Sequence, residues 1–145
     1  MSTPYSSVFE VFLEKITDME LPLMEDDTVR EKILTRYMTN ACSRFNKVCL
    51  VDLGDRSNET KEFNQELDDE IIDIITENMM VEWLRPKLLF TDNLSNKLNT
   101  KDFSHFSPAN LLKEIRETYD LINKRARGMI NNYSHSHSPI GKKKI

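Results

Sequence analysis

The sequence is poor in glycine and cysteine, and it contains no long hydrophobic run. Only 3 of its 145 residues are glycine, a proportion that disfavours turn-rich β architectures. The 2 cysteines, Cys42 and Cys49, provide neither a disulfide framework nor the paired spacing of a zinc ribbon, so we expect reduced thiols. The apolar runs fall far short of the roughly 20 residues that a membrane-spanning helix needs. These absences argue against a disulfide-stapled scaffold and against a membrane protein.

The composition is typical of a globular domain. Hydrophobic residues make up 39% of the chain and charged residues 30%. A chain of 145 residues buries about two-thirds of the surface that its unfolded form exposes, so we expect one core. The predicted fold is all-α, a bundle of about four helices with a long C-terminal helix. In this prediction residues 1–133 form a single helical domain and residues 134–145 form an extended basic tail.

Charge is unevenly distributed along the chain. From Ser104 onward there are eight basic residues and three acidic ones, a net charge of +5, which leaves −9 for residues 1–103 of a chain whose total is −4. Such asymmetry can steer the docking of copies or of partners with opposite charge. A solvated surface that happens to be uneven explains the same numbers equally well. The pI near 5.4 argues against nucleic-acid binding by the whole domain.

Apolar residues recur at three-to-four spacing in four stretches of the chain. They predict amphipathic helices near residues 5–17, 27–45, 67–90 and 107–133. Ser107 and Pro108 give the clearest start signal, because serine caps a helix and proline at the first helical position leaves no amide without a partner. Pro86 has no amide to donate to the preceding turn, so we expect a kink or a short break near Arg85.

The apolar stripes of these helices make up the predicted core. The first helix contributes Val8, Phe9, Phe12, Leu13 and Ile16; the second contributes Val29, Ile33, Tyr37, Ala41 and Phe45, flanked by Leu34, Met38 and Cys42; the third contributes Ile71, Ile72, Ile75, Met79, Trp83 and Leu84; the fourth contributes Leu111, Ile115, Tyr119, Ile122, Ala126, Met129, Ile130 and Tyr133. We expect Trp83 to be a core residue rather than a cofactor platform, because its neighbours are apolar at helical spacing. If fully buried, Trp83 and Ile115 should each cost roughly 2–5 kcal/mol of stability when replaced by alanine.

Residues 46–66 differ from the helical segments on either side. Val48 to Val51 is a short run rich in β-branched residues, and a polar, turn-rich segment follows it. One short strand and an irregular packed loop fit this pattern equally well. We expect at most one strand, and it would have to pair with another segment or with another subunit.

Histidine and cysteine side chains are the first candidates for chemistry. His135 and His137 flank a serine, but no cysteine or acidic residue lies beside them, so a disordered tail explains them better than a metal site. Cys42 or Cys49 paired with His105 would form a nucleophile and its base. A cysteine on a helix stripe is more often a small core residue, so we expect neither catalysis nor a cofactor.

Acidic runs are the remaining candidates. Residues 25–27 are all acidic, and residues 66–70 contain four acids, yet neither run has the glycine or the alternating oxygen ligands of a calcium loop. Acidic side chains are favourable at helix N-termini, where the helix dipole is positive. We therefore interpret both runs as helix-terminal acids and expect no metal.

Three segments resemble the head-tail connector, or adaptor, proteins of the neck of tailed bacteriophages. They are residues 63–72 (FNQELDDEII), 79–87 (MMVEWLRPK) and 101–116 (KDFSHFSPANLLKEIR), and the similarity extends over residues 63–133, about half of the chain. The resemblance implies a non-enzymatic virion protein that is assembled in the host bacterial cytoplasm as a ring of about twelve copies. It also implies contacts with the portal protein, with the tail or a second neck protein, and with the genomic DNA that passes through the channel.

The basic C-terminal segment is the predicted partner-binding site. Its residues are Ser138, Pro139, Ile140, Gly141, Lys142, Lys143, Lys144 and Ile145. The proline and isoleucines provide small anchors around a cationic stretch, and connector proteins commonly grip the portal with a terminal extension. The three lysines would also suit DNA phosphates, so the sequence leaves a protein partner and DNA both open. The alternative function is a small oligomeric helical protein that binds nucleic acid or regulates.

Overall fold

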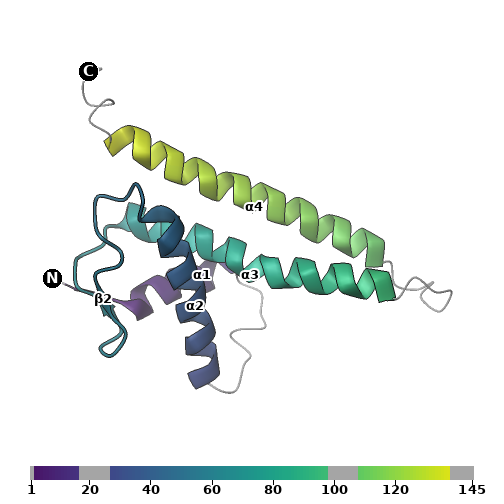
Figure 1. The fold of residues 1–145 in the computed structure, drawn as a ribbon, viewed down its shortest axis with the longest axis horizontal. Helices are drawn as coiled ribbons and strands as arrows, with labels where there is room; N and C mark the ends of the chain where they lie inside the picture. Colours follow the sequence, from purple (N-terminus) through teal and green to yellow (C-terminus); the bar gives the residue numbers. More distant parts are fainter. Residues whose placement is uncertain (1, 17–26, 98–107, 138–145) are drawn as a thin grey trace.

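The computed structural model describes residues 2–16, 27–97 and 108–137 as a mostly α-helical bundle (Figure 1). The helices are α1 (Tyr5–Ile16), α2 (Asp27–Phe45), α3 (Asp69–Lys97) and α4 (Pro108–His137). Helices α3 and α4 lie side by side as a long antiparallel pair, and α1 and α2 pack against the first half of α3 (Figure 1). The predicted fold class is confirmed. None of the described helices is long and apolar enough to cross a membrane.

A small sheet joins the N-terminus to the segment between α2 and α3. Its three strands, β1 (Thr3–Pro4), β2 (Arg56–Ser57) and β3 (Glu62–Phe63), lie in the order β1-β3-β2 and are antiparallel. Thr3 and Arg56 both pair with Phe63, on its two sides. The expectation of at most one strand was therefore wrong, and the run from Val48 to Val51 contains no strand. Strands of two residues have no detectable period, and their pairing joins residues far apart in the sequence.

The hydrogen bonds of Thr3 and Tyr5 hold this sheet against the helices. The Thr3 hydroxyl donates to the carbonyl of Gln65 at 3.2 Å and accepts the amide of Leu67 at 2.9 Å. The amide of Tyr5 donates to the carbonyl of Lys61 at 2.9 Å. Lys61 has a φ of 56°, the left-handed conformation that closes the turn between β2 and β3. The irregular segment is thus tied to the first turn of α1.

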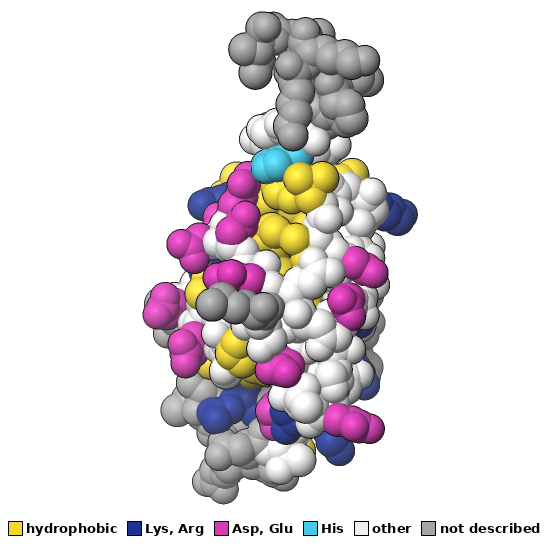
Figure 2. All heavy atoms as spheres, turned by 90° about the vertical axis from the view of Figure 1, so that its left-hand side faces the viewer, with side chains coloured by type: hydrophobic (Ala, Val, Ile, Leu, Met, Phe, Trp, Pro, Cys, Tyr) yellow, Lys and Arg dark blue, Asp and Glu magenta, His cyan; other side chains and the backbone are white. Residues whose placement is uncertain are grey.

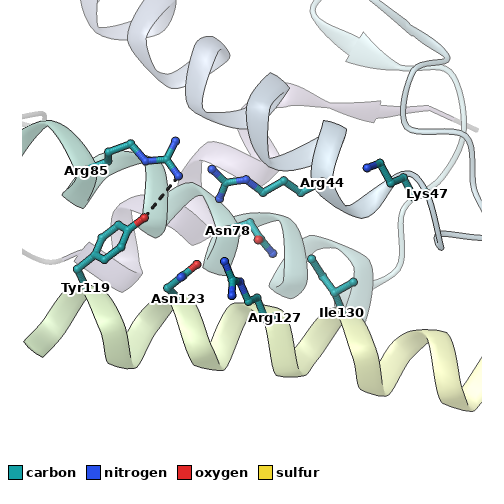
Figure 3. A pocket seen from close by; sticks show the side chains of 8 residues that line it. All are labelled: Arg44, Lys47, Asn78, Arg85, Tyr119, Asn123, Arg127 and Ile130. Atoms are coloured by element: carbon teal, nitrogen blue, oxygen red, sulfur yellow. Dashed lines mark hydrogen bonds between the residues drawn. The ribbon is translucent and has the colours of Figure 1, made fainter.

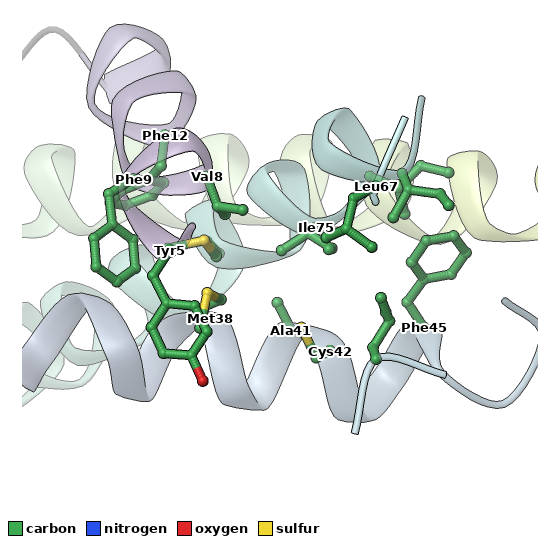
Figure 4. Packing of buried hydrophobic residues seen from close by; sticks show 14 of the residues in the cluster. Tyr5, Val8, Phe9, Phe12, Met38, Ala41, Cys42, Phe45, Leu67 and Ile75 are labelled. Carbon is green, nitrogen blue, oxygen red and sulfur yellow. The ribbon is translucent and has the colours of Figure 1, made fainter. Parts of the chain in front are cut away.

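The core lies where α1, α2 and the first half of α3 meet (Figure 4). Its largest fully buried side chains include Phe12, Met38, Phe45, Ile75 and Met79. Residues 74–79 of α3 are buried all round, because α1, α2 and α4 each cover part of this helix. A helix that is surrounded in this way is the central element of the bundle.

Several predicted core positions are less buried than expected. Val29 is 42% exposed, so the buried stripe of α2 begins at Leu34 rather than at Val29. Trp83 and Ile115 are only half-buried: Trp83 packs on the edge of the core, and Ile115 lies on the first part of α4. The predicted loss of 2–5 kcal/mol for these two residues required full burial, and a smaller loss is now expected. The side chain of Leu111 lies outside the described residues.

The boundaries of α3 differ from the prediction at both ends. The helix begins at Asp69, and the Asp68 carboxylate accepts the amide of Ile71 at 2.8 Å, as an N-cap does. The acids at its start are therefore helix-terminal, as predicted. The helix continues through Pro86 to Lys97, so the short break expected near Arg85 is wrong, and the alternative of a kink stays a prediction. Proline removes one intrahelical hydrogen bond, and packing against α4 keeps the two halves of α3 together.

Helix α4 begins at Pro108 as predicted and extends further than predicted. The structure includes Ser134 to His137 in the helix, which corrects the tail boundary at residue 134. The ring of His137 stacks on that of Tyr133 at a centroid distance of 4.0 Å, and its Nδ1 lies 2.9 Å from the Tyr133 carbonyl oxygen. These contacts hold the side chain of His137 against Tyr133 in the last turn of α4, although the polar composition of that turn does not predict such packing. The capping role expected of Ser107 lies outside the described residues.

Candidate functional site

The sequence-predicted site lies outside the part of the chain that the structure describes. It comprises Ser138, Pro139, Ile140, Gly141, Lys142, Lys143, Lys144 and Ile145. The described residues instead form two surfaces that the sequence analysis did not assign. One is a cleft lined by basic side chains, and the other is the exposed apolar end of the α3–α4 pair.

The basic cleft lies between α2, α3 and α4 and has a volume of about 330 Å³ (Figure 3). Its lining residues are Arg44 from the last turn of α2, Lys47 from the turn that follows α2, Asn78 and Arg85 from α3, and Tyr119, Asn123, Arg127 and Ile130 from α4. Four of these eight residues are cationic, and none of the described lining residues is acidic. The cleft therefore offers donors and positive charge from three helices at once.

The buried carboxylate of Glu82 holds two of the arginines in place. Glu82 is 7% exposed and accepts hydrogen bonds from Arg44, from Arg85 at 3.4 Å and from Nδ2 of the Asn40 side chain at 3.4 Å. A buried carboxylate needs such partners, because desolvation of an unpaired charge is costly. Glu82 therefore fixes where the guanidinium groups of α2 and α3 lie.

Tyr119 positions Arg85 from the opposite side. Nη2 of Arg85 donates to the hydroxyl of Tyr119 at 3.4 Å, which joins α3 to α4 across the cleft (Figure 3). This hydrogen bond raises the pKa of Arg85 above its ordinary value, burial opposes that shift, and the charge of Glu82 adds to it. Arg85 is consequently a permanent cation with a restrained guanidinium group.

Lys47 and Arg127 differ from the two restrained arginines. Both side chains are exposed, and neither has an ion-pair partner among the residues that the structure describes. The single negative charge of Glu82 offsets one of the four positive charges, so the cleft retains a formal charge of +3. An anion entering the cleft would meet two positioned guanidinium groups and two cations that no described acidic side chain pairs with.

The second surface is the end of the helix pair that projects beyond α1 and α2 (Figure 1). We define this arm as residues 85–97 of α3 and 108–119 of α4, because Arg85 faces Tyr119. Leu89 and Phe90 on the arm are 59% and 67% exposed, and the exposed Pro86 lies one turn before Phe90. Adjacent large apolar side chains in water are typical of an interaction surface.

The opposite end of the molecule has a different character. Figure 2 shows a strip of apolar side chains below a histidine, with aspartate and glutamate side chains on both sides of it. The segment of residues 46–66 lies at this end and carries the exposed Leu50. The amide of Leu50 donates to the hydroxyl of Tyr133 at 3.3 Å, which fastens the segment to α4.

The cysteine candidates for chemistry have unfavourable surroundings. Cys42 is buried in the core, and burial raises the pKa of its thiol to about 12. Burial also raises the pKa of the half-buried Cys49, whose Sγ lies 4.0 Å from the hydroxyl of Tyr133. A protonated thiol is a poor nucleophile. The proposed partner His105 lies outside the described residues.

The remaining candidates are also accounted for by packing. No group of three histidine, cysteine, aspartate or glutamate side chains in the described residues could hold a metal ion. Trp83 packs against the core, as predicted, and the ammonium group of Lys87 lies 5.0 Å from its ring centroid.

Comparisons with protein-family models, with curated proteins and with solved structures found no match for this chain.

Proposed function

We propose that this chain is a non-enzymatic structural protein that forms a ring in the neck of a tailed bacteriophage. The ring would connect the capsid portal to the tail and surround the DNA channel. The resemblance of residues 63–133 to head-tail connector proteins motivates the location, and the exposed arm supports the assembly. In this proposal the protein is assembled in the host cytoplasm and becomes part of the virion.

The exposure of Leu89 and Phe90 is the observation that carries this proposal. Full burial of one such side chain is worth about 1.5–3 kcal/mol, so a monomer that leaves both in water forgoes a substantial stabilisation. An apolar patch that docks on a different patch of the next copy repeats from subunit to subunit. Such heterologous contacts form a ring when the rotation between copies closes and an open filament when it does not. The arm is thus suited to be the contact between neighbouring copies.

Size-exclusion chromatography with light scattering tests the assembly. The parent chain should have the mass of about twelve copies, and the double variant Leu89→Ser/Phe90→Ser should be monomeric because serine removes the apolar surface. Leu121→Ser is the matched control, since Leu121 is 68% exposed but lies outside the arm. A parent chain that stays monomeric at every concentration would contradict the proposal.

The C-terminal segment is the part we assign to the portal contact. Deletion of residues 138–145 leaves all of α4 in place, whereas deletion from Ser134 would remove its last turn and the stack of His137 on Tyr133. The shorter deletion should preserve the ring and weaken its co-sedimentation with the portal protein. Unchanged occupancy of the portal by the truncated ring would show that these residues do not dock there.

The same experiments distinguish the alternative function. A small nucleic-acid-binding or regulatory protein would form a dimer rather than a ring, and its affinity for DNA would fall steeply with salt. Finding both properties would replace the structural proposal with this alternative.

A further inference from the structure

We infer that the basic cleft between α2, α3 and α4 is a binding site for a phosphate group. The inference goes beyond the proposed function, because neither Leu89 nor Phe90 lines the cleft and phosphate binding does not require a ring. The ligand is a phosphate ester or anhydride, carried either by a free nucleotide-sized molecule or by the backbone of a nucleic acid.

The side chains of the cleft are of the types that bind phosphate. Arg44, Arg85 and Arg127 present three guanidinium groups, whose planar forks match phosphate oxygens with two parallel hydrogen bonds. Lys47, two residues after the end of α2, adds a compact positive charge. This set of cations is the one expected for phosphate recognition, and a single carboxylate, Glu82, offsets part of its charge.

Part of the site is held in position before any ligand binds. Glu82 and Tyr119 restrain Arg44 and Arg85, so these guanidinium groups lose little conformational freedom when an anion binds. Each guanidinium group has five N–H donors, so its contact with Glu82 or Tyr119 leaves others for a ligand. Arg127 and Lys47 can then close on the anion from the rim.

The size and lining of the cleft also suit a ligand that carries a phosphate group. A volume of about 330 Å³ is at the lower end of the range for small-molecule sites. The carboxamides of Asn78 and Asn123 add neutral polar groups, and Ile130 provides an apolar wall. Asn78 is itself held by its Nδ2, which donates to the carbonyl of Ile74 at 2.9 Å. The cleft therefore has room and contacts for more than the phosphate alone.

Isothermal titration of the full-length chain with pyrophosphate tests the site. We expect saturable binding that Arg127→Gln weakens about tenfold and Lys47→Gln by about threefold, because a guanidinium group makes two hydrogen bonds and an ammonium group acts as a point charge. Arg36→Gln on α2 and Lys124→Gln on α4 are the matched controls. Both residues are exposed and neither lines the cleft, so affinity should change less than about twofold.

The source of the phosphate is decided by two further titrations. Binding of ADP without binding of a short oligothymidine, with the same dependence on Arg127, assigns the site to free phosphorylated ligands. Tighter binding of oligothymidine, again weakened by Arg127→Gln, assigns it to a nucleic-acid backbone. The Leu89→Ser/Phe90→Ser variant should bind equally well, so failure of the ring and failure of this site are separate results.

Three outcomes would overturn the inference. The first is the absence of saturable binding for all three ligands, and the second is an equal loss of affinity in Arg36→Gln and Arg127→Gln. The third is a change in oligomer mass in Arg127→Gln with an unchanged affinity for pyrophosphate. That result would assign the cleft to a carboxylate of a neighbouring copy instead.

Discussion

Replacing Tyr133 separates the contribution of its ring from that of its hydroxyl. The side chain is 2% exposed, its ring lies edge-on to Phe45 at a centroid distance of 4.9 Å, and its hydroxyl accepts the amide of Leu50 at 3.3 Å. Tyr133→Ala removes an aromatic ring from the core, which costs about 3–5 kcal/mol. Tyr133→Phe removes the hydroxyl, and with it the hydrogen bond from Leu50 and the weak 4.0 Å contact with Sγ of Cys49, which costs about 0.5–1.5 kcal/mol. We therefore expect the alanine variant to lose at least about twice as much stability as the phenylalanine variant.

Urea denaturation measures both losses, with the fluorescence of Trp83, the single tryptophan, and circular dichroism as probes. The variants should be made in the Leu89→Ser/Phe90→Ser background, because assembly would otherwise make stability depend on concentration. Leu121→Ala, at an exposed position, is the control and should change stability by less than about 0.5 kcal/mol. Equal unfolding free energies for Tyr133→Phe and Tyr133→Ala would refute the packing of the ring against Phe45.

Three further predictions follow from single residues. Pro86→Ala restores an amide donor inside α3 at an exposed position, so the free energy of unfolding should rise by up to about 3 kcal/mol in urea denaturation. Lys61→Gly relieves the left-handed conformation and gives up only an exposed ion pair with Glu31, so stability should rise by up to about 1 kcal/mol. Because the pKa of Cys42 is about 12 in the folded chain and its ordinary value is 9.0, the unfolded chain loses this proton first, and stability should fall as pH rises from 9 towards 12. At about pH 10.5 the Cys42 contribution to this loss should approach about 2 kcal/mol, and a Cys42→Ala variant with the same pH dependence as the parent would contradict it.

The sequence predicted those features that depend on neighbouring residues. The four helices follow from apolar spacing, the acidic residues expected at a helix N-terminus lie in the first turn of α3, and α4 begins at Pro108, as its start signal predicted. Both signals act within one helical turn, so no knowledge of the tertiary fold is needed to read them.

Features that depend on distant residues were missed. The sheet pairs Thr3 with Phe63, and nothing within either two-residue strand indicates its partner. The continuity of α3 through Pro86 depends on packing against α4, which outweighs a local signal to stop. Val29 was wrongly assigned to the buried stripe of α2, because it continues the apolar spacing but is 42% exposed.

The basic cleft was missed for the same reason. Arg44, Arg85 and Arg127 are about 40 residues apart in the sequence, and only the antiparallel packing of the helices brings them together. The excess of basic residues after Ser104 was a partial signal, since Arg127 belongs to it. The role of Glu82 in placing two arginines has no counterpart in the local sequence.

Single-particle electron microscopy of the purified parent chain tests the central claim most directly. We predict closed rings of about twelve copies, with the arm that carries Leu89 and Phe90 buried against the neighbouring subunit. Monomers or dimers, or rings in which both side chains remain in solvent, would contradict the account.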